Sequence, residues 1–206
     1  MSNRYINQKS SVLSTQQYTK CVIGLDRDGV LNRDLGTYVT NPNDFEPIEG
    51  SIEAVAKLRA MGHKIAIITN QGGIEKGLMS IDDVENVHKY MFELLGLAGC
   101  PSIDAIYYSA SSRKDDEYAK PNLGMFKRCE KENPTIKFSQ GFFVGDKISD
   151  LKAAMKIGAT PILVRTGHGL ETEELINKRF TYQKIKKAAR VFDNLAAFVD
   201  WIEKRN

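Results

Sequence analysis

Residues 21–32 read Cys-Val-Ile-Gly-Leu-Asp-Arg-Asp-Gly-Val-Leu-Asn, an apolar run that changes abruptly into acidic residues. A short, continuous aliphatic run is typical of a strand that is buried on both faces of a sheet. Asp26 and Asp28 follow at the end of that strand, and because they are two residues apart, their side chains can project to the same side of the sheet edge. Gly29 allows the chain to turn and a ligand to come close. The stretch predicts a buried strand that ends at a pair of carboxylates.

Outward from this stretch, strand patterns alternate with stretches of helical periodicity. We expect strands at residues 20–25, 64–69, 103–108, 141–144 and 161–165, and helices at residues 51–61, 80–95, 123–132, 149–157 and 194–204. The strand runs show no alternation of apolar and polar residues, which is typical of a parallel sheet covered by helices on both faces. We therefore predict an α/β fold with a doubly wound, Rossmann-like parallel sheet.

The chain has 206 residues, which suits one sizeable core. We expect a single domain over residues 20–206, and a flexible tail over the polar residues 1–19. No repeat or linker divides the predicted domain.

Composition and charge exclude several classes of protein. The net charge is only +3, too mild by itself to predict nucleic acid or a membrane surface as a partner. No apolar stretch approaches the roughly 18 residues of a membrane span, and residues 1–19 lack the apolar segment of a secretory signal. Three scattered cysteines, none at metal spacing, fit a reducing compartment. We expect a cytoplasmic monomer.

Polar residues follow each of the relevant strands. The first strand ends at Asp26 and Asp28, the second at residues 69–73 (Thr-Asn-Gln-Gly-Gly), and the third leads through a polar loop to Lys120. The fourth ends at Asp146 and Lys147, with Asp150 beyond. The carboxyl ends of parallel strands meet in one crevice, so these side chains are expected to lie together.

This set suits transfer of a phosphoryl group to a carboxylate. Asp26 would attack phosphorus, and Asp28 would protonate the leaving oxygen and then deprotonate the attacking water. Because a carboxylate repels a phosphate dianion, a cation is needed. Mg²⁺ prefers hard oxygen ligands, and it would be held by the carboxylates of Asp26 and Asp146 and by a backbone carbonyl oxygen near Asp28.

The remaining candidates would support that reaction. Lys120 and the metal would neutralise the equatorial oxygens, and Thr69 would hold a phosphate oxygen. Other expected substrate contacts are Asn32, Asn70, Lys120 and Lys147, and Asp150 is expected beside the metal or as one of its ligands.

These residues resemble the haloacid dehalogenase superfamily of phosphatases that use an aspartate nucleophile. The family's four motifs correspond in order to Asp26 with Asp28, to Thr69, to Lys120, and to Asp146 with Asp150. Finer features resemble the branch of histidinol-phosphate phosphatases and D-glycero-D-manno-heptose 1,7-bisphosphate phosphatases. They are residues 26–32, 38–39, 69–74 with Gly77, 120–125, 145–147 and 165–169. The resemblance implies almost no cap domain, and no large insertion follows Asp28 or Thr69.

One departure from the branch is large. Its members often carry a zinc loop with three cysteines and a histidine, yet residues 109–119 contain neither residue type. We therefore expect no zinc. Ala119 stands where the heptose enzymes have an arginine that contacts the second phosphate, so the sequence leaves bisphosphate specificity open; Arg113 or Lys114 could substitute.

Three functions remain open from the sequence. We expect a Mg²⁺-dependent phosphomonoesterase acting on a small metabolite, either a heptose-type sugar phosphate or histidinol phosphate. A polynucleotide 3′-phosphatase is the alternative enzyme, because that family shares the motifs at residues 69–74 and 120–125, although the sequence has no basic stripe with interleaved aromatic residues. A non-hydrolytic phospho-accepting or phosphate-binding domain is the third possibility.

Overall fold

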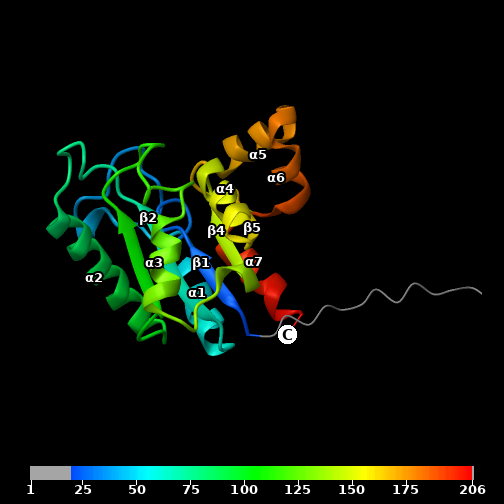
Figure 1. Ribbon diagram of the computed structural model, residues 1–206. Helices are drawn as coiled ribbons and strands as arrows, with labels where there is room; N and C mark the ends of the chain where they lie inside the picture. Colours follow the sequence, from blue (N-terminus) through cyan, green and yellow to red (C-terminus); the bar gives the residue numbers. More distant parts are fainter. Residues whose placement is uncertain (1–19, 206) are drawn as a thin grey trace, which may run out of the picture.

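The computed structural model describes residues 20–205, and Figure 1 shows them as a sheet with helices on both sides. The predicted tail, residues 1–19, lies outside the described residues. The first half of the chain contains β1 (Val22–Leu25), η1 (Pro42–Asp44), α1 (Ser51–Ala60), β2 (Lys64–Asn70), α2 (Ile81–Leu97) and β3 (Ala105–Ser109). The second half contains α3 (Gly124–Glu132), η2 (Phe138–Gln140), β4 (Phe142–Gly145), α4 (Ile148–Ile157), β5 (Thr160–Val164), α5 (Gly169–Lys178), η3 (Phe180–Tyr182), α6 (Gln183–Ala188), β6 (Arg190–Phe192) and α7 (Leu195–Glu203).

The strands form one parallel sheet in the order β3-β2-β1-β4-β5-β6. β1 lies at the centre, where Ile23 pairs with Ile65 on one side and with Phe142 on the other. Successive strands are added in one direction before β4 and in the opposite direction after it. Ligands of doubly wound sheets bind beside such a reversal, at the carboxyl ends of the strands. The predicted fold class is therefore confirmed, and the sheet order places the expected site between β1 and β4.

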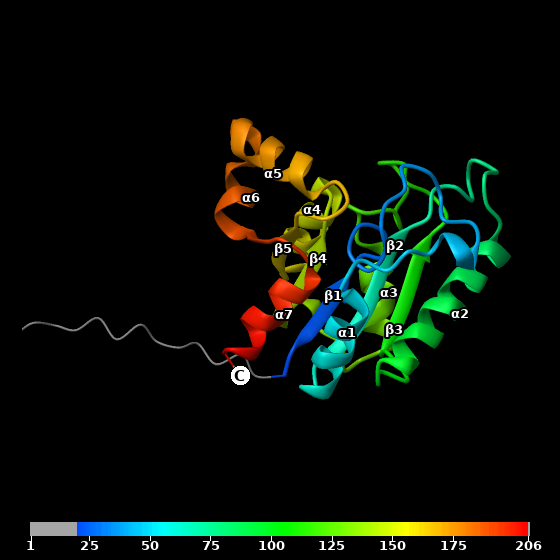
Figure 2. The same cartoon turned by 180° about the vertical axis from the view of Figure 1, so that it is seen from behind.

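Each face of the sheet has its own apolar core. Ile23 and Leu25 of β1 pack with residues of α1, α2 and α7, the helices that Figure 2 shows in front of or beside the sheet. Val22 belongs to the opposite core, with Phe126 of α3 and Ala153 of α4. Successive residues of β1 are thus buried in different cores, because a strand projects successive side chains to opposite faces of the sheet.

The five predicted strands and five predicted helices are present, and their ends shift by no more than two residues. The sequence interpretation missed β6, α5 and α6, which follow β5. The basic stretch 184–190 is mostly exposed, but its Ile185 is buried in a small cluster with Leu151, Leu163 and Ile176. A single buried side chain in so short a helix leaves little periodicity to detect.

The connections after β1 and β2 contain little secondary structure. Residues 26–50 contain only η1, and residues 71–80 contain no helix or strand, so within residues 20–205 no separate cap covers the ends of the strands, as expected. None of the described helices is both long enough and apolar enough to cross a membrane.

Candidate active site

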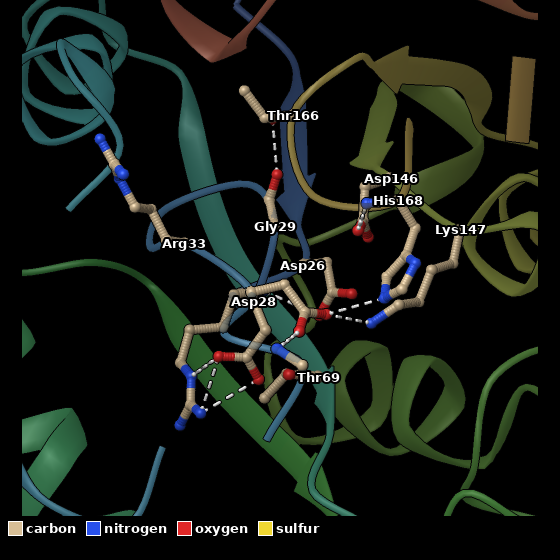
Figure 3. A network of polar contacts seen from close by, with 12 residues as sticks. Asp26, Asp28, Gly29, Arg33, Thr69, Asp146, Lys147, Thr166 and His168 are labelled. Atoms are coloured by element: carbon tan, nitrogen blue, oxygen red, sulfur yellow. Dashed lines mark hydrogen bonds and ion pairs between the residues drawn. The ribbon is translucent and has the colours of Figure 1, made fainter. Parts of the chain in front are cut away.

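Asp26 lies directly after β1, at the centre of the sheet's carboxyl edge (Figure 3). Its backbone N–H donates to the carbonyl oxygen of Val144 at 2.9 Å, which continues the pairing of β1 with β4. Its carboxylate Oδ1 accepts a hydrogen bond from the backbone N–H of Arg27 at 2.8 Å. The Asp26 side chain is thus fixed by main-chain contacts at the point where the two central strands end.

Lys120 reaches this carboxylate from the loop that follows β3. Its Nζ lies 2.9 Å from Asp26 Oδ1 and 2.8 Å from Asp150 Oδ1, and all three residues are buried. Burial by itself would lower the pKa of Lys120, but the charges of Asp150 and Asp26 outweigh it and raise that pKa. Lys120 is therefore a cation held between two carboxylates.

Asn70 holds the backbone of Lys120 in place. Its Oδ1 accepts from the Lys120 N–H at 2.9 Å, and its Nδ2 donates to the Lys120 carbonyl oxygen at 3.2 Å. Because Asn70 ends β2, this pair of hydrogen bonds joins the third loop to the sheet edge. The loop can then present the lysine side chain at a defined place.

Three buried carboxylates gather beside Lys120. Asp26, Asp146 and Asp150 each offer an oxygen within 4.8 Å of the others. Oδ2 of Asp146 accepts from the backbone N–H of His168 at 2.8 Å, while its Oδ1 is buried without a hydrogen-bond partner within residues 20–205. Burial, with the neighbouring charges of Asp150 and Asp26, raises the pKa of Asp146 to about 8. A buried carboxylate oxygen without a partner is the kind of group that a cation satisfies.

Two glycines make room for Asp146. Gly29 and Gly167 have φ values of +86° and +56°, and a Cβ on either would lie 2.3 Å from Asp146 Oδ2. The Thr166 hydroxyl donates to the Gly29 carbonyl oxygen at 2.6 Å, which joins the two turns (Figure 3). The carboxylate can therefore be enclosed by backbone on both sides only because neither position carries a side chain.

Asp28 points into a different set of contacts. Its oxygens accept from Arg27 at 2.9–3.1 Å, from Asn32 Nδ2 at 3.0 Å and from Gln71 Nε2 at 2.8 Å. Burial by itself raises its pKa, but the Arg27 charge and these hydrogen bonds outweigh burial, and the pKa of Asp28 is lowered. Its side chain is not part of the acidic group formed by Asp26, Asp146 and Asp150.

Gln71 links Asp28 to Thr69. The same Nε2 that donates to Asp28 Oδ2 also donates to the Thr69 hydroxyl oxygen at 3.1 Å. Thr69 is the penultimate residue of β2 and is buried. The second predicted motif is thus tied to the first through one amide side chain.

A crevice of about 950 Å³ is lined in part by Asp28, Asn70 and Lys120 of this site. Asp28 and Asp34 are the carboxylates in its lining, whereas the lysines that line it are Lys76, Lys114, Lys120, Lys147, Lys152 and Lys156. Asp34 Oδ2 accepts from Lys147 Nζ at 2.9 Å and lies 3.3 Å from His168 Nε2. The crevice is rich in positive charge and suits an anionic ligand.

The predicted residues do not all face the crevice. Asp26, Lys120, Asp146 and Asp150 come together, and Asn70 and Lys147 line the crevice wall. Asn32 is fully buried and donates to Asp28 and to the Arg33 carbonyl oxygen, so it lies behind Asp28.

From the sequence, Arg27 and Asp34 have no expected catalytic or binding role, His88 is expected to be structural or solvated, and Gln71 is only part of a motif. β1 ends at Leu25, before Arg27, so strand alternation gives no direction for the Arg27 side chain.

Comparisons with known proteins identify the family of the chain. The family described as "Polynucleotide kinase 3 phosphatase" matches residues 22–189. The D-glycero-D-manno-heptose-1,7-bisphosphate 7-phosphatase of Chlorobaculum tepidum is 37% identical over 163 residues, which are 73% of this chain and 81% of the relative. The D-glycero-beta-D-manno-heptose-1,7-bisphosphate 7-phosphatase of Pseudomonas putida is 34% identical over 173 residues, 84% of this chain and 94% of the relative.

Solved structures give the same result. The D,D-heptose 1,7-bisphosphate phosphatase of B. bronchiseptica, crystallised with magnesium and phosphate, is 29% identical with a TM-score of 0.80, covering 90% of this chain and 99% of that one. Its counterpart from Burkholderia thailandensis has a TM-score of 0.65 at 29% identity, covering 89% and 99%. These likenesses favour hydrolysis over the phospho-accepting alternative. The chain therefore belongs to the family described as "Polynucleotide kinase 3 phosphatase" and, within the haloacid dehalogenase superfamily, to the group of D-glycero-D-manno-heptose-1,7-bisphosphate phosphatases.

Proposed function

We propose that this phosphatase hydrolyses a phosphomonoester of a small phosphorylated sugar through an aspartyl-phosphate on Asp26, and that residues 20–206 act as one domain. The observation that carries the proposal is the buried contact of Asp26 with Lys120, beside an acidic group that has an unsatisfied oxygen on Asp146. A nucleophilic carboxylate needs cations around it, because the phosphate it attacks is itself an anion.

The acidic group fits Mg²⁺. Asp26 and Asp146 would hold the ion, with a backbone carbonyl near Asp28, and Asp150 lies beside it with one oxygen on Lys120. Hard carboxylate oxygens are the ligands that Mg²⁺ prefers, and the ion would supply charge that offsets the repulsion between carboxylate and phosphate. The related B. bronchiseptica enzyme was crystallised with magnesium and phosphate, which supports this choice.

We propose that no zinc is bound. The loop after β3 is tied by its own polar groups: Ser109 and Ser111 hydroxyls accept from backbone N–H groups at 3.1 Å. Asn122 Nδ2 donates to the carbonyl oxygens of Lys114 and Asp116 at 2.9 and 2.8 Å. These contacts hold the loop where branch members use cysteine and histidine ligands.

The chemistry would proceed in two steps. An oxygen of Asp26 forms a bond to phosphorus while the bond from phosphorus to the leaving oxygen breaks, and Asp28 gives that oxygen a proton. A water then attacks phosphorus, its proton passes to Asp28, and the bond between Asp26 and phosphorus breaks. The lowered pKa of Asp28 keeps its carboxylate ionised, which is the form that accepts the proton of water in the second step. The negative charge of a bound phosphoryl group would raise the pKa of Asp28 and favour the protonated form that the first step needs.

Lys120 and Thr69 would bind the transferred group. Lys120, already 2.9 Å from Asp26, would neutralise charge on an equatorial oxygen. Thr69, held by Gln71, would donate its hydroxyl hydrogen to another oxygen. Asn70, which is also an expected substrate contact, would act by holding the backbone of Lys120 in place.

For the substrate, we propose a heptose-type sugar that carries a second phosphate. The names of the relatives support this class, and so does a crevice lined by six lysines and only two carboxylates. Ala119 is fully buried and offers no charge. A second phosphate would therefore be bound by lysines of the crevice, such as Lys114 or Lys152.

The decisive test is phosphate release with Mg²⁺ from a panel of sugar mono- and bisphosphates and histidinol phosphate. We expect the highest kcat/KM for a heptose 1,7-bisphosphate, with turnover abolished in Asp26→Asn at an unchanged far-UV CD spectrum. Substantial activity of the Asp26→Asn variant would overturn the nucleophile, and a clear preference for histidinol phosphate would overturn the sugar assignment.

A second candidate is a polynucleotide 3′-phosphatase, which the description of the matching family favours. An uncapped crevice rich in lysine could admit the end of a nucleic acid strand. Turnover of a 3′-phosphorylated oligonucleotide that falls steeply with salt would support it, because each phosphate contact releases counterions. Absence of turnover on that oligonucleotide would remove it.

A further inference from the structure

Arg27 lies between Asp26 and Asp28 in the sequence, and its side chain is fully buried. Its Nε and Nη2 donate to Asp28 at 2.9–3.1 Å, and Nη2 also donates to Gln71 Oε1 at 3.1 Å. Its Nη1 lies 3.2 Å from Nε2 of His88, on α2. The guanidinium is therefore fixed from several sides without reaching solvent.

The contact with His88 has only one chemically sensible form. An arginine side chain donates hydrogen bonds and accepts none, so Nε2 of His88 must be the acceptor and the imidazole must be neutral. Burial, together with the Arg27 charge, lowers the pKa of His88 to about 3, which agrees with that assignment. The His88 ring also packs edge-on against Tyr108, with ring centroids 5.7 Å apart, so its orientation is set by packing.

The other end of this network is the acid–base group. Asp28 accepts from Arg27, Asn32 and Gln71, and Gln71 also donates to Thr69. Arg27 is fully buried, and its guanidinium contacts Asp28, Gln71 and His88. Arg27 and His88 would therefore act on the reaction through the residues that they hold.

We propose that His88 and Arg27 are positioning residues: His88 fixes the guanidinium of Arg27, and Arg27 in turn aims the Asp28 carboxylate at the leaving oxygen and at the attacking water. This inference rests on the acid–base function proposed for Asp28. A misplacement of such a group by a fraction of an ångström costs catalytic rate even when substrate binding is retained.

Stability alone gives a poor account of the arrangement. The desolvation of a buried ion pair offsets much of its Coulombic attraction, and apolar replacements are often as stable. A bidentate guanidinium contact, in contrast, imposes a defined orientation on a carboxylate. The network therefore suits orientation better than it suits stabilisation.

The test compares His88→Gln with His88→Met. Glutamine can place an acceptor near the position of Nε2, whereas methionine has a similar shape and no comparable acceptor. Both variants are assayed with an alkyl phosphate, whose leaving oxygen needs a proton, and with p-nitrophenyl phosphate, whose leaving group needs little protonation. For His88→Met we expect kcat/KM on the alkyl phosphate to fall about tenfold more than on p-nitrophenyl phosphate, with KM little changed. His88→Gln should restore most of that loss.

Two further measurements keep the outcome interpretable. His63 is a buried histidine at the other end of the strands, beside Cys21; the pair His63→Gln and His63→Met reproduces the loss of packing, and we expect neither variant to change the ratio of the two substrates. Asp28→Asn should lose alkyl-phosphate turnover.

If Asp28→Asn keeps that turnover, the acid–base proposal itself fails. If Asp28→Asn is inactive but His88→Met and His88→Gln show the same ratio of kcat/KM on the two substrates, the positioning inference alone is overturned. Arg27→Lys cannot form the bidentate contact with Asp28, so this variant should change the ratio of kcat/KM on the two substrates as His88→Met does. An unchanged ratio in Arg27→Lys would also contradict the inference.

Discussion

Lys120 Nζ lies 2.9 Å from Asp26 Oδ1, although nearly a hundred residues separate the two in the chain. The lysine side chain is 1% exposed and that of Asp26 is 8% exposed, so water screens the contact little. Asp150 contacts the same Nζ at 2.8 Å from the other side. One lysine therefore compensates two carboxylates at the point where phosphorus is proposed to be attacked.

Replacing Lys120 by methionine should destabilise the protein and stop turnover. Removing one partner of a buried ion pair costs about 3–5 kcal/mol because it leaves an uncompensated charge. The double variant Lys120→Met with Asp150→Asn should recover part of the unfolding free energy, measured with urea, but no phosphate release. Recovered turnover in the double variant would mean that Lys120 only compensates Asp150 and takes no part in the reaction.

Asp146→Asn should separate metal binding from folding. Because burial and neighbouring acids raise the pKa of Asp146 to about 8, folding disfavours its ionised form when no metal is bound. An amide does not carry that cost, so the metal-free variant should melt at or above the wild-type temperature. Mg²⁺ at a hundredfold excess over Kd should stabilise the wild type by about 2.7 kcal/mol and the variant far less. Equal Mg²⁺-induced shifts of Tm would exclude Asp146 as a ligand.

Gly29→Ala should disturb the same carboxylate by steric contact. A Cβ there lies 2.3 Å from Asp146 Oδ2 at a φ of +86°, so left-handed strain of about 1–2 kcal/mol adds to a clash of about 1–3 kcal/mol. Gly36→Ala is the matched control, since its φ is +71° and nothing lies within 4 Å of the Cβ. Thermal unfolding should show a larger loss at position 29, with weaker Mg²⁺ binding only there; equal losses would contradict the packing argument.

His88 should make the protein less stable in acid. Its pKa is lowered from 6.5 to about 3 in the folded state, so between those values the unfolded chain binds a proton that the folded chain does not. Stability from this group is complete above pH 6.5 and falls as the pH drops toward 3. From pH 7 to pH 5 the loss is about 2 kcal/mol. Urea unfolding of His88→Gln should show a pH dependence smaller by that amount, and an identical dependence would mean that folding does not lower the pKa of His88.

The strands of the sheet were predictable because each is a continuous apolar run beside a turn, and this signal is local. β6 was missed because it is only Arg190–Phe192, too short to show a pattern. Its place comes from pairing with β5, where Val191 lies opposite Leu163. The helices before it, α5 and α6, bury few side chains, so their periodicity is weak.

The candidate site was predictable to the extent that its residues follow strand ends. Asp26, Lys120 and Asp146 carry recognisable motifs, and parallel strands bring their carboxyl ends together. The partners of those residues were not predictable in the same way. Asn32 resembled a substrate contact, yet it is buried behind Asp28, and His88, 61 residues from Arg27 in the chain, resembled an ordinary helical residue.

By itself, the sequence determined which side chains stand at the carboxyl edge, since apolar runs and the turns after them depend on neighbouring residues alone. Only the tertiary structure decided how those side chains are paired: Lys120 with both Asp26 and Asp150, and Asp28 with Arg27 rather than with the other acids. The physical reason is that a buried charge must find a partner wherever folding brings one within reach, and that distance is a property of the packed sheet and its helices.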